Sequence, residues 1–220
     1  MTKPCKRNAV VIFSKAPIAG EVKTRLAKNL GEKNALLVYK AMLRVICKIL
    51  SSQGQWDCYL SASKELDHPF FRELMDEFDL KTHLQIEGDL GAKMKTAMDD
   101  LLGAYDQVAI VGGDAISITS ESLETCFDGL SNNDVALVPA EDGGYISIVA
   151  KKTDPSMFSD IEWGTEKVLE QQLARFSQMG WDTWLNSRLW DLDELDDFKR
   201  VKTMPELYQS MLDAGLSKNI

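Results

Sequence analysis

The sequence predicts an α/β protein in which helices flank a mostly parallel sheet. Short apolar runs typical of buried strands alternate with segments of helical periodicity, and no repeat or linker interrupts this alternation. With 45% hydrophobic composition over 220 residues, the chain can bury roughly 70% of the surface that its unfolded form exposes. We therefore expect one sizeable domain that spans residues 1–220.

Seven segments carry the strand pattern. The first, NAVVIF, is a short apolar run, and the fourth, QVAIVGG, is an apolar run that ends in two glycines. In chain order the expected strands cover residues 8–13, 56–62, 82–87, 107–113, 134–140, 145–151 and 182–187.

Two connecting segments have apolar residues at helical spacing. The first stripe consists of Met94, Met98, Leu101, Leu102 and Tyr105, and the second of Val168, Leu169, Leu173 and Phe176. Both stripes predict amphipathic helices that cover the sheet. We expect the methionines of the first stripe to fill the core rather than to form a binding surface.

Composition limits the partners of the protein. Its 25 Lys and Arg residues against 34 Asp and Glu give a net charge of −9, which would repel a phosphate backbone, so no nucleic-acid partner is expected. No apolar run approaches the roughly 20 residues of a membrane span. The four cysteines are scattered, without a C-x-x-C pair or a preceding signal peptide: Cys5, Cys47, Cys58 and Cys126. We expect reduced thiols and a cytoplasmic protein.

The segment SKAPIAGEVKTRLAKNLG follows the first expected strand, at the end of the sheet where open α/β folds bind ligands. A Walker A loop is excluded because Pro17 and Val22 occupy its two glycine positions, and no G-x-G-x-x-G fingerprint is present. A turn at Gly20 would bring backbone N–H groups, Lys23 and Arg25 onto an anionic group. The alternative interpretation is a solvated basic turn.

Carboxylates follow two later strands. Asp114 comes directly after the fourth expected strand and should emerge at the same sheet edge as the cationic loop, where it could bind Mg²⁺ together with phosphate oxygens. The alternative is a helix cap or turn residue. Glu141 and Asp142 precede Gly143-Gly144, which is typical either of a tight hairpin or of a site that a ligand approaches closely.

A third acidic segment, WDLDELDDF, places Asp191 and Asp193 on one face if it is extended. Such a run is more commonly the solvated start of a helix. The only histidines, His68 and His83, stand beside polar or charged residues, so a histidine-based metal or nucleophilic site is not expected.

Six motifs together resemble a known family. In order they are FSKAPIAGEVKTRLA, QIEGDLGAKM, VGGDAIS, PAEDGGYISIV, WGTEKVL and DLDELDDF. This set is similar to the glycosyltransferase-A-like nucleotide-diphospho-sugar transferases, relatives of the 2-phospholactate and molybdenum-cofactor guanylyltransferases. The resemblance implies a Rossmann-like (GT-A-like) fold, a nucleotide at the ends of the first strands, and Mg²⁺ or Mn²⁺ held by Asp114.

The resemblance also implies roles for individual residues. Lys15, Gly20, Lys23 and Arg25 would cradle the phosphates, and Gly88, Asp89, Gly91 and Lys93 would form the loop near the base or ribose. Asp114 would bind the metal, and Asp193 could either approach the metal or cap the last helix. Asp142 and the residues Trp163, Gly164 and Thr165 would line the acceptor side. Lys23, Arg25, Asp114 and Asp142 are the residues expected to carry catalysis, and the loop positions of Lys23 and Arg25 are expected to depend on the ligand.

The sequence departs from the family pattern after Asp114, where a second acid and a proline are missing and Ser117 stands in the place of the acid. We expect a metal-dependent transferase that uses a nucleotide-sugar or a nucleoside triphosphate and an unidentified small-molecule acceptor, with sugar transfer favoured. One alternative is a guanylyltransferase-like nucleotidyltransferase acting on a phosphorylated acceptor. Another is a non-catalytic nucleotide sensor whose metal site is partly lost.

Overall fold

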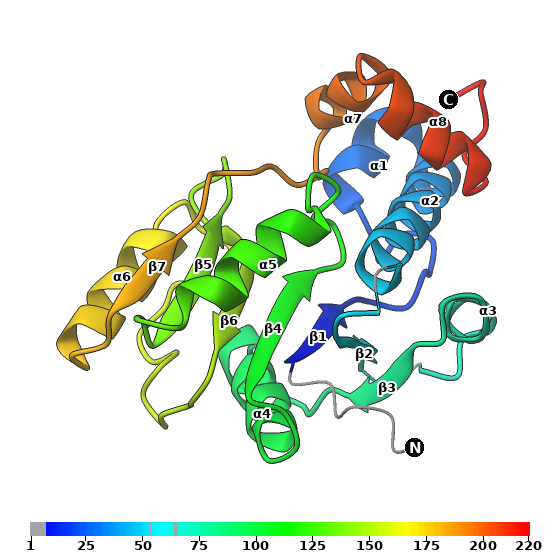
Figure 1. Cartoon of the computed structure of the whole chain (residues 1–220). Coiled ribbons are helices and arrows are strands. Elements are labelled where there is room, and N and C mark those ends of the chain that lie inside the picture. The colour runs from blue at the N-terminus through cyan, green and yellow to red at the C-terminus, as the bar shows by residue number, and fades with distance from the viewer. Residues whose placement is uncertain (1–7, 53, 64–65) are drawn as a thin grey trace, which may run out of the picture.

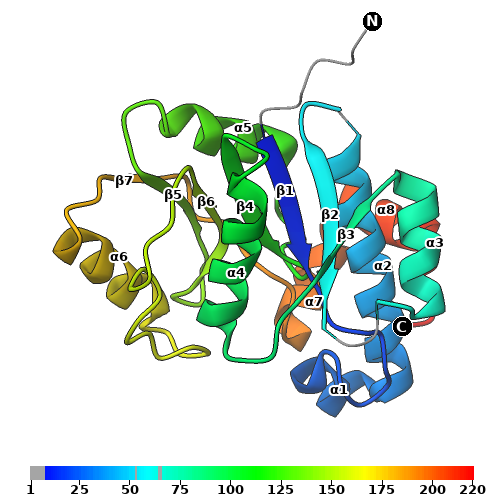
Figure 2. The same ribbon diagram turned by 90° about the horizontal axis from the view of Figure 1, so that it is seen from below.

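The computed structural model describes residues 8–52, 54–63 and 66–220, in which a seven-stranded sheet lies between helices (Figures 1 and 2). The strands are β1 (Asn8–Phe13), β2 (Asp57–Ala62), β3 (Lys81–Leu84), β4 (Gln107–Gly112), β5 (Val135–Pro139), β6 (Tyr145–Ala150) and β7 (Thr183–Leu185). Their order is β3-β2-β1-β4-β6-β5-β7, and only β6 runs antiparallel to its neighbours. The predicted mostly parallel α/β fold is confirmed.

Each of the seven predicted segments contains a strand, and the largest differences occur at the sheet edges. The segment 82–87 is strand only as far as Leu84, and 182–187 is strand only over Thr183–Leu185. Both β3 and β7 are edge strands that pair on one side alone, so fewer ladder hydrogen bonds hold them extended.

Two helical layers bury the two faces of the sheet. The helices are α1 (Thr24–Leu30), α2 (Glu32–Ser51), α3 (Pro69–Phe78), α4 (Leu90–Leu102), α5 (Ser120–Gly129), α6 (Val168–Gln178), α7 (Leu195–Lys202) and α8 (Pro205–Asp213). Core residues of α2, α3 and α5 pack on one face, and those of α4 and α6 pack on the other. Both predicted amphipathic helices are confirmed as α4 and α6, with Met94 and Met98 buried in the core.

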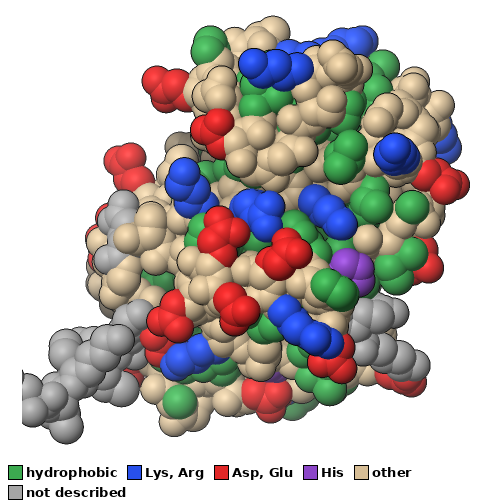
Figure 3. All heavy atoms as spheres, turned by 90° about the vertical axis from the view of Figure 1, so that its right-hand side faces the viewer, with side chains coloured by type: hydrophobic (Ala, Val, Ile, Leu, Met, Phe, Trp, Pro, Cys, Tyr) green, Lys and Arg blue, Asp and Glu red, His purple; other side chains and the backbone are tan. Residues whose placement is uncertain are grey.

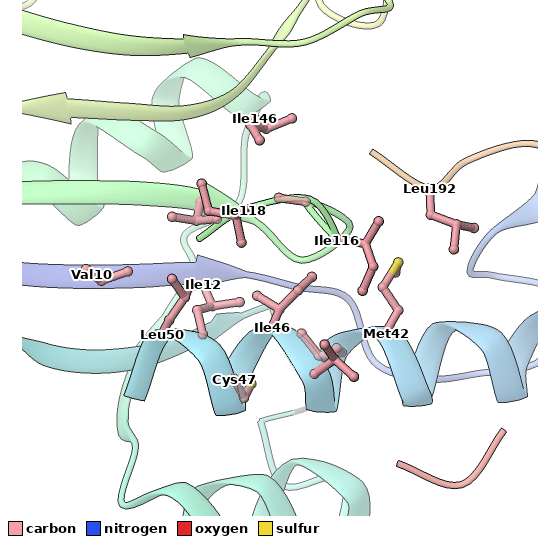
Figure 4. Close-up of a cluster of buried hydrophobic side chains, with 14 of the residues drawn as sticks. Val10, Ile12, Met42, Ile46, Cys47, Leu50, Ile116, Ile118, Ile146 and Leu192 are labelled. Atoms are coloured by element: carbon pink, nitrogen blue, oxygen red, sulfur yellow. The ribbon is translucent and has the colours of Figure 1, made fainter. Parts of the chain in front are cut away.

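One core cluster reaches the end of the sheet where ligands were expected. Val10 and Ile12 of β1 face Met42 and Ile46 of α2, and Leu192 extends this apolar cluster from the segment before α7 (Figure 4). Leu192 is fully buried. Burial of such a side chain stabilises the fold by roughly 1.5–3 kcal/mol, so the core fixes the C-terminal acidic segment beside the end of β4.

The surface over α2, α3 and α8 carries charges of both signs. Figure 3 shows Lys and Arg side chains next to Asp and Glu side chains on this face. For example, Arg44 lies 3.2 Å from Glu73 and 3.1 Å from Glu77. Positive and negative side chains therefore lie side by side on the face that Figure 3 shows.

Two further expectations concern membranes and thiols. In the part of the chain that the structure describes, no helix is both long and apolar enough to cross a membrane. Cys47, Cys58 and Cys126 are buried free cysteines, while Cys5 lies outside the described residues. Burial raises the pKa of the Cys47 and Cys126 thiols, which disfavours their reactive thiolate form.

Candidate active site

A cleft of about 1090 Å³ opens at the carboxyl ends of β1 and β4. Its lining comes from the loop after β1, the loop after β4, the β5–β6 hairpin, residues 163–166 and the segment before α7. Ten of the predicted site residues line it: Lys15, Lys23, Arg25, Lys93, Asp114, Asp142, Trp163, Gly164, Thr165 and Asp193. The expectation that the cationic loop and Asp114 share one sheet edge is therefore confirmed.

Lys23 is the buried centre of this cleft. Its side chain is 5% exposed, and its Nζ lies 3.1 Å from Asp114 Oδ2 and 3.3 Å from Asp193 Oδ1. Burial by itself lowers the pKa of Lys23, but the two carboxylates outweigh this effect and hold the pKa above its ordinary value. The expectation that the ligand positions Lys23 is wrong, because the protein's own carboxylates already fix it.

Arg25 differs from Lys23 in its exposure. Its side chain is 61% exposed, with NH1 3.2 Å from Asp193 Oδ2 and 3.7 Å from Glu194 Oε1. Exposed ion pairs of this kind are worth little, typically about 0–1 kcal/mol. The guanidinium of Arg25 can therefore leave these carboxylates for a phosphate at small cost.

Tyr39 of α2 fixes the start of the first loop. Its hydroxyl accepts a hydrogen bond from the Lys15 N–H (3.0 Å) and donates one to the Lys15 carbonyl (2.8 Å). The tyrosine is buried and lines the cleft. Sequence reasoning missed Tyr39, because its apolar neighbours in α2 make it resemble an ordinary core residue.

Asp114 reaches the cleft because the two preceding residues are glycines. A Cβ on Gly113 would lie 2.7 Å from the Phe13 carbonyl oxygen, and one on Gly112 would lie 2.7 Å from Asp114 Oδ1. Of the alternative interpretation, the turn is confirmed and the helix cap is wrong: Asp114 lies in a turn after β4, and Thr119 caps α5 by accepting a hydrogen bond from the Ser122 N–H. The carboxylate of Asp114 is thus left for Lys23 and for a ligand.

The segment before α7 presents two carboxylates with different partners. Leu192 points into the core and its N–H donates to the Asp114 carbonyl (3.1 Å), while Asp191 and Asp193 on either side line the cleft. Burial, together with the carboxylates of Asp114 and Asp142, raises the pKa of Asp191 to about 7. Asp193 is neutralised by Lys23 and Arg25, whereas Asp191 remains beside like charges.

Ser117, which replaces the second acid of the family pattern, holds this segment in place. Its hydroxyl accepts a hydrogen bond from the Trp190 N–H (2.9 Å) and donates one to the Trp190 carbonyl. Ser117 is not among the residues that line the cleft. The side chain is committed to the backbone next to Asp191 rather than directed into the cleft.

The Glu141–Gly144 segment forms the tight hairpin of the first interpretation, and its role toward a ligand stays a prediction. It connects the antiparallel strands β5 and β6 as a hairpin, with Gly143 at φ 91° and the Asp142 Oδ1 accepting a hydrogen bond from the Gly144 N–H (2.9 Å). A Cβ on Gly143 would lie only 2.2 Å from the Glu166 carbonyl oxygen. The tight turn therefore lets the loop of Glu166 pack closely, and Asp142 still lines the cleft.

Four predicted ligand-binding positions serve the backbone instead. Gly20 and Gly88 adopt positive φ values of 83° and 139° and are not among the lining residues. Asp89 caps α4 by accepting a hydrogen bond from the Ala92 N–H (2.7 Å), and Gly91 lies where a Cβ would be 2.8 Å from the Phe158 Cβ. Of the four residues predicted for this second loop, Lys93 lines the cleft, and so does the neighbouring Leu90.

The donor set of the cleft fits a divalent cation that arrives with its ligand. Within residues 8–52, 54–63 and 66–220, no three Asp, Glu, His or Cys side chains are grouped closely enough to hold a metal ion by themselves. Asp114 and Asp191 nevertheless interact as like charges, which a cation between them would relieve. Mg²⁺ commonly takes one or two carboxylates and completes its shell with phosphate oxygens and water.

The fold and the cleft define an α/β protein with a charged cleft at the carboxyl ends of its strands. The sequence matches the family described as "Uncharacterized protein conserved in bacteria (DUF2064)" over residues 47–165, more than half of the chain, and the protein belongs to this family. A comparison with curated proteins gave no match.

Solved structures share the fold. A protein from Desulfovibrio desulfuricans described as a "putative nucleotide-diphospho-sugar transferase" is similar with a TM-score of 0.78 and 22% identity, over 95% of this chain and 98% of that chain. A nucleotidyl transferase from Methanothermobacter is similar with a TM-score of 0.61 and 11% identity, over 93% of this chain and 99% of that chain. Rv0371c of Mycobacterium tuberculosis, in complex with manganese, is similar with a TM-score of 0.51 and 14% identity, over 89% of this chain and 97% of that chain. The predicted resemblance is thus confirmed at the level of the fold.

The raised pKa of Asp191 predicts a pH-dependent stability. Between pH 3.8, the ordinary pKa of an aspartate, and about pH 7, the folded protein keeps a proton on Asp191 that the unfolded chain has lost. The free energy of unfolding therefore falls as the pH rises through this window. Asp191→Asn keeps the neutral form at every pH. In metal-free buffer its melting temperature should match that of the parent near pH 4 and exceed it at pH 8.

Asp193→Asn is the matched control for this prediction. It removes one carboxylate from Lys23 and from Arg25, so it should melt below the parent at pH 8. A difference between Asp191→Asn and the parent that stays constant from pH 4 to pH 8 would show that Asp191 does not titrate in this window.

Proposed function

We propose that this protein is a divalent-metal-dependent transferase whose chain acts as one nucleotide-binding domain and takes a nucleotide-sugar or a nucleoside triphosphate as its donor. The observation that carries the proposal is the meeting of exposed cations with Asp114 and Asp191 in one cleft at the carboxyl ends of β1 and β4. This arrangement is complementary to a metal–diphosphate group. The names of the nucleotide-diphospho-sugar transferase and the nucleotidyl transferase among the similar structures support the same class.

Three cations of the cleft are suited to the phosphates. Arg25 is exposed and only weakly paired, and the side chains of Lys15 and Lys93 make no ion pair with any residue that the structure describes. An Arg guanidinium can hold two phosphate oxygens at once, and Lys adds a mobile point charge. Lys23 has a different role, because it neutralises Asp114 and Asp193 from within the protein.

Asp114 and Asp191 are the residues that would hold Mg²⁺ or Mn²⁺. We assign this role to Asp191 in place of the predicted Asp193, because the carboxylate of Asp193 already pairs with Lys23 and Arg25. When bound, the cation would neutralise the charge that develops on the departing phosphate group. The manganese complex of the structurally similar Rv0371c supports a divalent ion in this fold.

Sugar transfer is the reaction that we favour. A hydroxyl oxygen of the acceptor forms a bond to the anomeric carbon of the sugar, the bond from that carbon to the diphosphate oxygen breaks, and the nucleoside diphosphate leaves. The proton of the hydroxyl passes to a carboxylate at the cleft, for which Asp142 is the candidate on the acceptor side. Arg25 and Lys15 stabilise the charge on the departing diphosphate.

Nucleotidyl transfer is the second candidate, and the similarity to the Methanothermobacter nucleotidyl transferase favours it. In that reaction, an oxygen of a phosphorylated acceptor bonds to the α-phosphorus of a nucleoside triphosphate and pyrophosphate leaves. The non-catalytic alternative remains the third candidate; against it, Asp114 and Asp191 still bring two carboxylates into the cleft, while Ser117 bonds to the backbone of Trp190.

Asp114→Asn tests the metal-dependent part of this proposal. Thermal shifts are measured with nucleoside diphosphates, nucleoside triphosphates and nucleotide-sugars, each with Mn²⁺, with Mg²⁺ and with chelator. A ligand at about 100 times its dissociation constant stabilises by roughly 2.7 kcal/mol. For the parent we expect a shift that needs the metal, and for Asp114→Asn we expect the metal-dependent part to disappear.

Two features keep this test interpretable. Asp114→Asn also removes a partner of Lys23, so the ligand-induced shift is compared rather than the melting temperature itself. Asp128→Asn, an exposed aspartate on α5, serves as the matched control. The proposal fails if no nucleotide shifts the parent, or if Asp114→Asn keeps the full metal-dependent shift.

Arg25→Ala should weaken nucleotide binding without unfolding the protein. Loss of one charge-assisted contact costs on the order of 1.5–3 kcal/mol, which is about a tenfold to a hundredfold rise in the dissociation constant. Lys28→Ala removes an exposed cation from the same helix, outside the cleft, and should bind nucleotide like the parent. Isothermal titration calorimetry gives both values, and equal affinities for the two variants would contradict the phosphate role of Arg25.

A further inference from the structure

Tyr145 and Trp163 both line the cleft and form a surface that we call the aromatic wall. Neither residue has a phosphate-binding role in the function proposed above. The two rings meet edge to face, with centroids 6.5 Å apart at 80°. Behind the wall, Phe158 packs on Trp163 with centroids 6.1 Å apart. The indole of Trp163 is therefore supported by two other aromatic rings.

Gly91 completes the support of the wall from the first turn of α4. A Cβ at this position would lie 3.0 Å from Trp163 Cζ2 and 2.8 Å from the Phe158 Cβ. Only glycine lets the helix approach the indole this closely. The orientation of Trp163 is consequently set by packing before any ligand enters, which is the arrangement that a specific binding surface needs.

The polar side chains beside the wall have donor and acceptor atoms that the described residues leave free for a ligand. The Trp163 indole N–H is not buried and has no partner among the described residues. The carboxylate of Glu166 makes no ion pair or hydrogen bond with any part of the chain that the structure describes, and only Oδ1 of Asp142 is engaged, by the Gly144 N–H. The wall is thus bordered by one free donor and by carboxylate acceptors.

This combination excludes some ligand classes. Asp142 and Glu166 would repel a phosphate or a carboxylate placed against the wall. Carboxylates accept hydrogen bonds from hydroxyl groups, and an indole face packs against the C–H groups of a saturated ring. The wall therefore suits an uncharged ring that carries several hydroxyl groups.

We propose that the aromatic wall, with Asp142 and Glu166, binds the uncharged sugar ring carried by the donor nucleotide. This assigns Trp163 to the donor instead of the predicted acceptor side, and it places Asp142 between the donor sugar and the acceptor. This inference rests on the proposed function and selects sugar transfer over nucleotidyl transfer to a phosphorylated acceptor. The same two carboxylates also line a second, smaller hollow of about 480 Å³. Trp163 is in this account the residue that distinguishes a nucleotide-sugar from the bare nucleotide.

The test compares paired ligands by isothermal titration calorimetry with Mn²⁺. The pairs are UDP with UDP-glucose, GDP with GDP-mannose, and ADP with ADP-glucose. For the parent, we expect the hexose form of at least one pair to bind about three to ten times more tightly than its diphosphate. In Trp163→Ala this ratio should fall to about one while the affinity for the diphosphate is retained, and Trp163→Phe should keep part of the ratio.

Trp184→Ala provides the matched control, since Trp184 is 39% exposed on β7 and lies outside the cleft. It should keep the ratio of the parent. The inference is overturned if Trp163→Ala keeps the affinity ratio of the parent. If it keeps that ratio because it binds the diphosphate and the hexose form more weakly by the same factor, the indole stacks on the base. If no diphosphate binds to the parent at all, the proposed function fails and the inference falls with it.

Discussion

The buried ammonium of Lys23 is the interaction on which the cleft depends. It joins three segments that are far apart in the chain: the loop after β1, the end of β4 at Asp114, and the segment before α7 at Asp193. Removing one partner of a buried ion pair typically costs about 3–5 kcal/mol, because the other charge is left without compensation. The three segments therefore keep their arrangement only while Lys23 is charged and in place.

The backbone of Lys23 shows that this arrangement is imposed by the surroundings. Its φ of 48° and ψ of 46° lie in the left-handed region at the start of α1. For a residue other than glycine, this conformation costs roughly 1–3 kcal/mol and persists when neighbouring contacts determine it. The two carboxylates supply those contacts, so the conformation of the loop and the charge of the cleft are coupled.

The charged side chains around Lys23 fall into two groups: some are paired within the protein, and others stay accessible in the cleft. Asp193 is neutralised within the protein, while Asp191, held by Leu192 in the core and by the bonds of Ser117 to Trp190, remains beside Asp114 and Asp142. Arg25, Lys15 and Lys93 stay accessible in the same cleft. A group that combines a cation with a diphosphate satisfies both sets of charges at once.

The sequence predicts much of this arrangement. Apolar runs locate the five inner strands, whereas the weaker patterns of 82–87 and 182–187 match the edge strands β3 and β7 only in part. The position of Asp114 after VGG correctly predicts a carboxylate at the cationic edge. Local pattern could not separate Asp191 from Asp193, because their different roles arise from Lys23, which is distant in sequence. The same limit applies to Gly91, whose contact with Trp163 crosses from α4 to another loop. Ser117 likewise acquires its role only where the chain returns at Trp190.

The most direct measurement of the central claim is a crystal structure of the protein with Mn²⁺ and the nucleoside diphosphate that binds it, phased to reveal the anomalous signal of manganese. We expect one manganese peak within coordination distance of the carboxylates of Asp114 and Asp191, with phosphate oxygens on the opposite side of the ion. Lys23 should still be paired with Asp193. A manganese ion bound instead at Asp193 and Glu194, or a nucleotide bound outside the cleft, would contradict it.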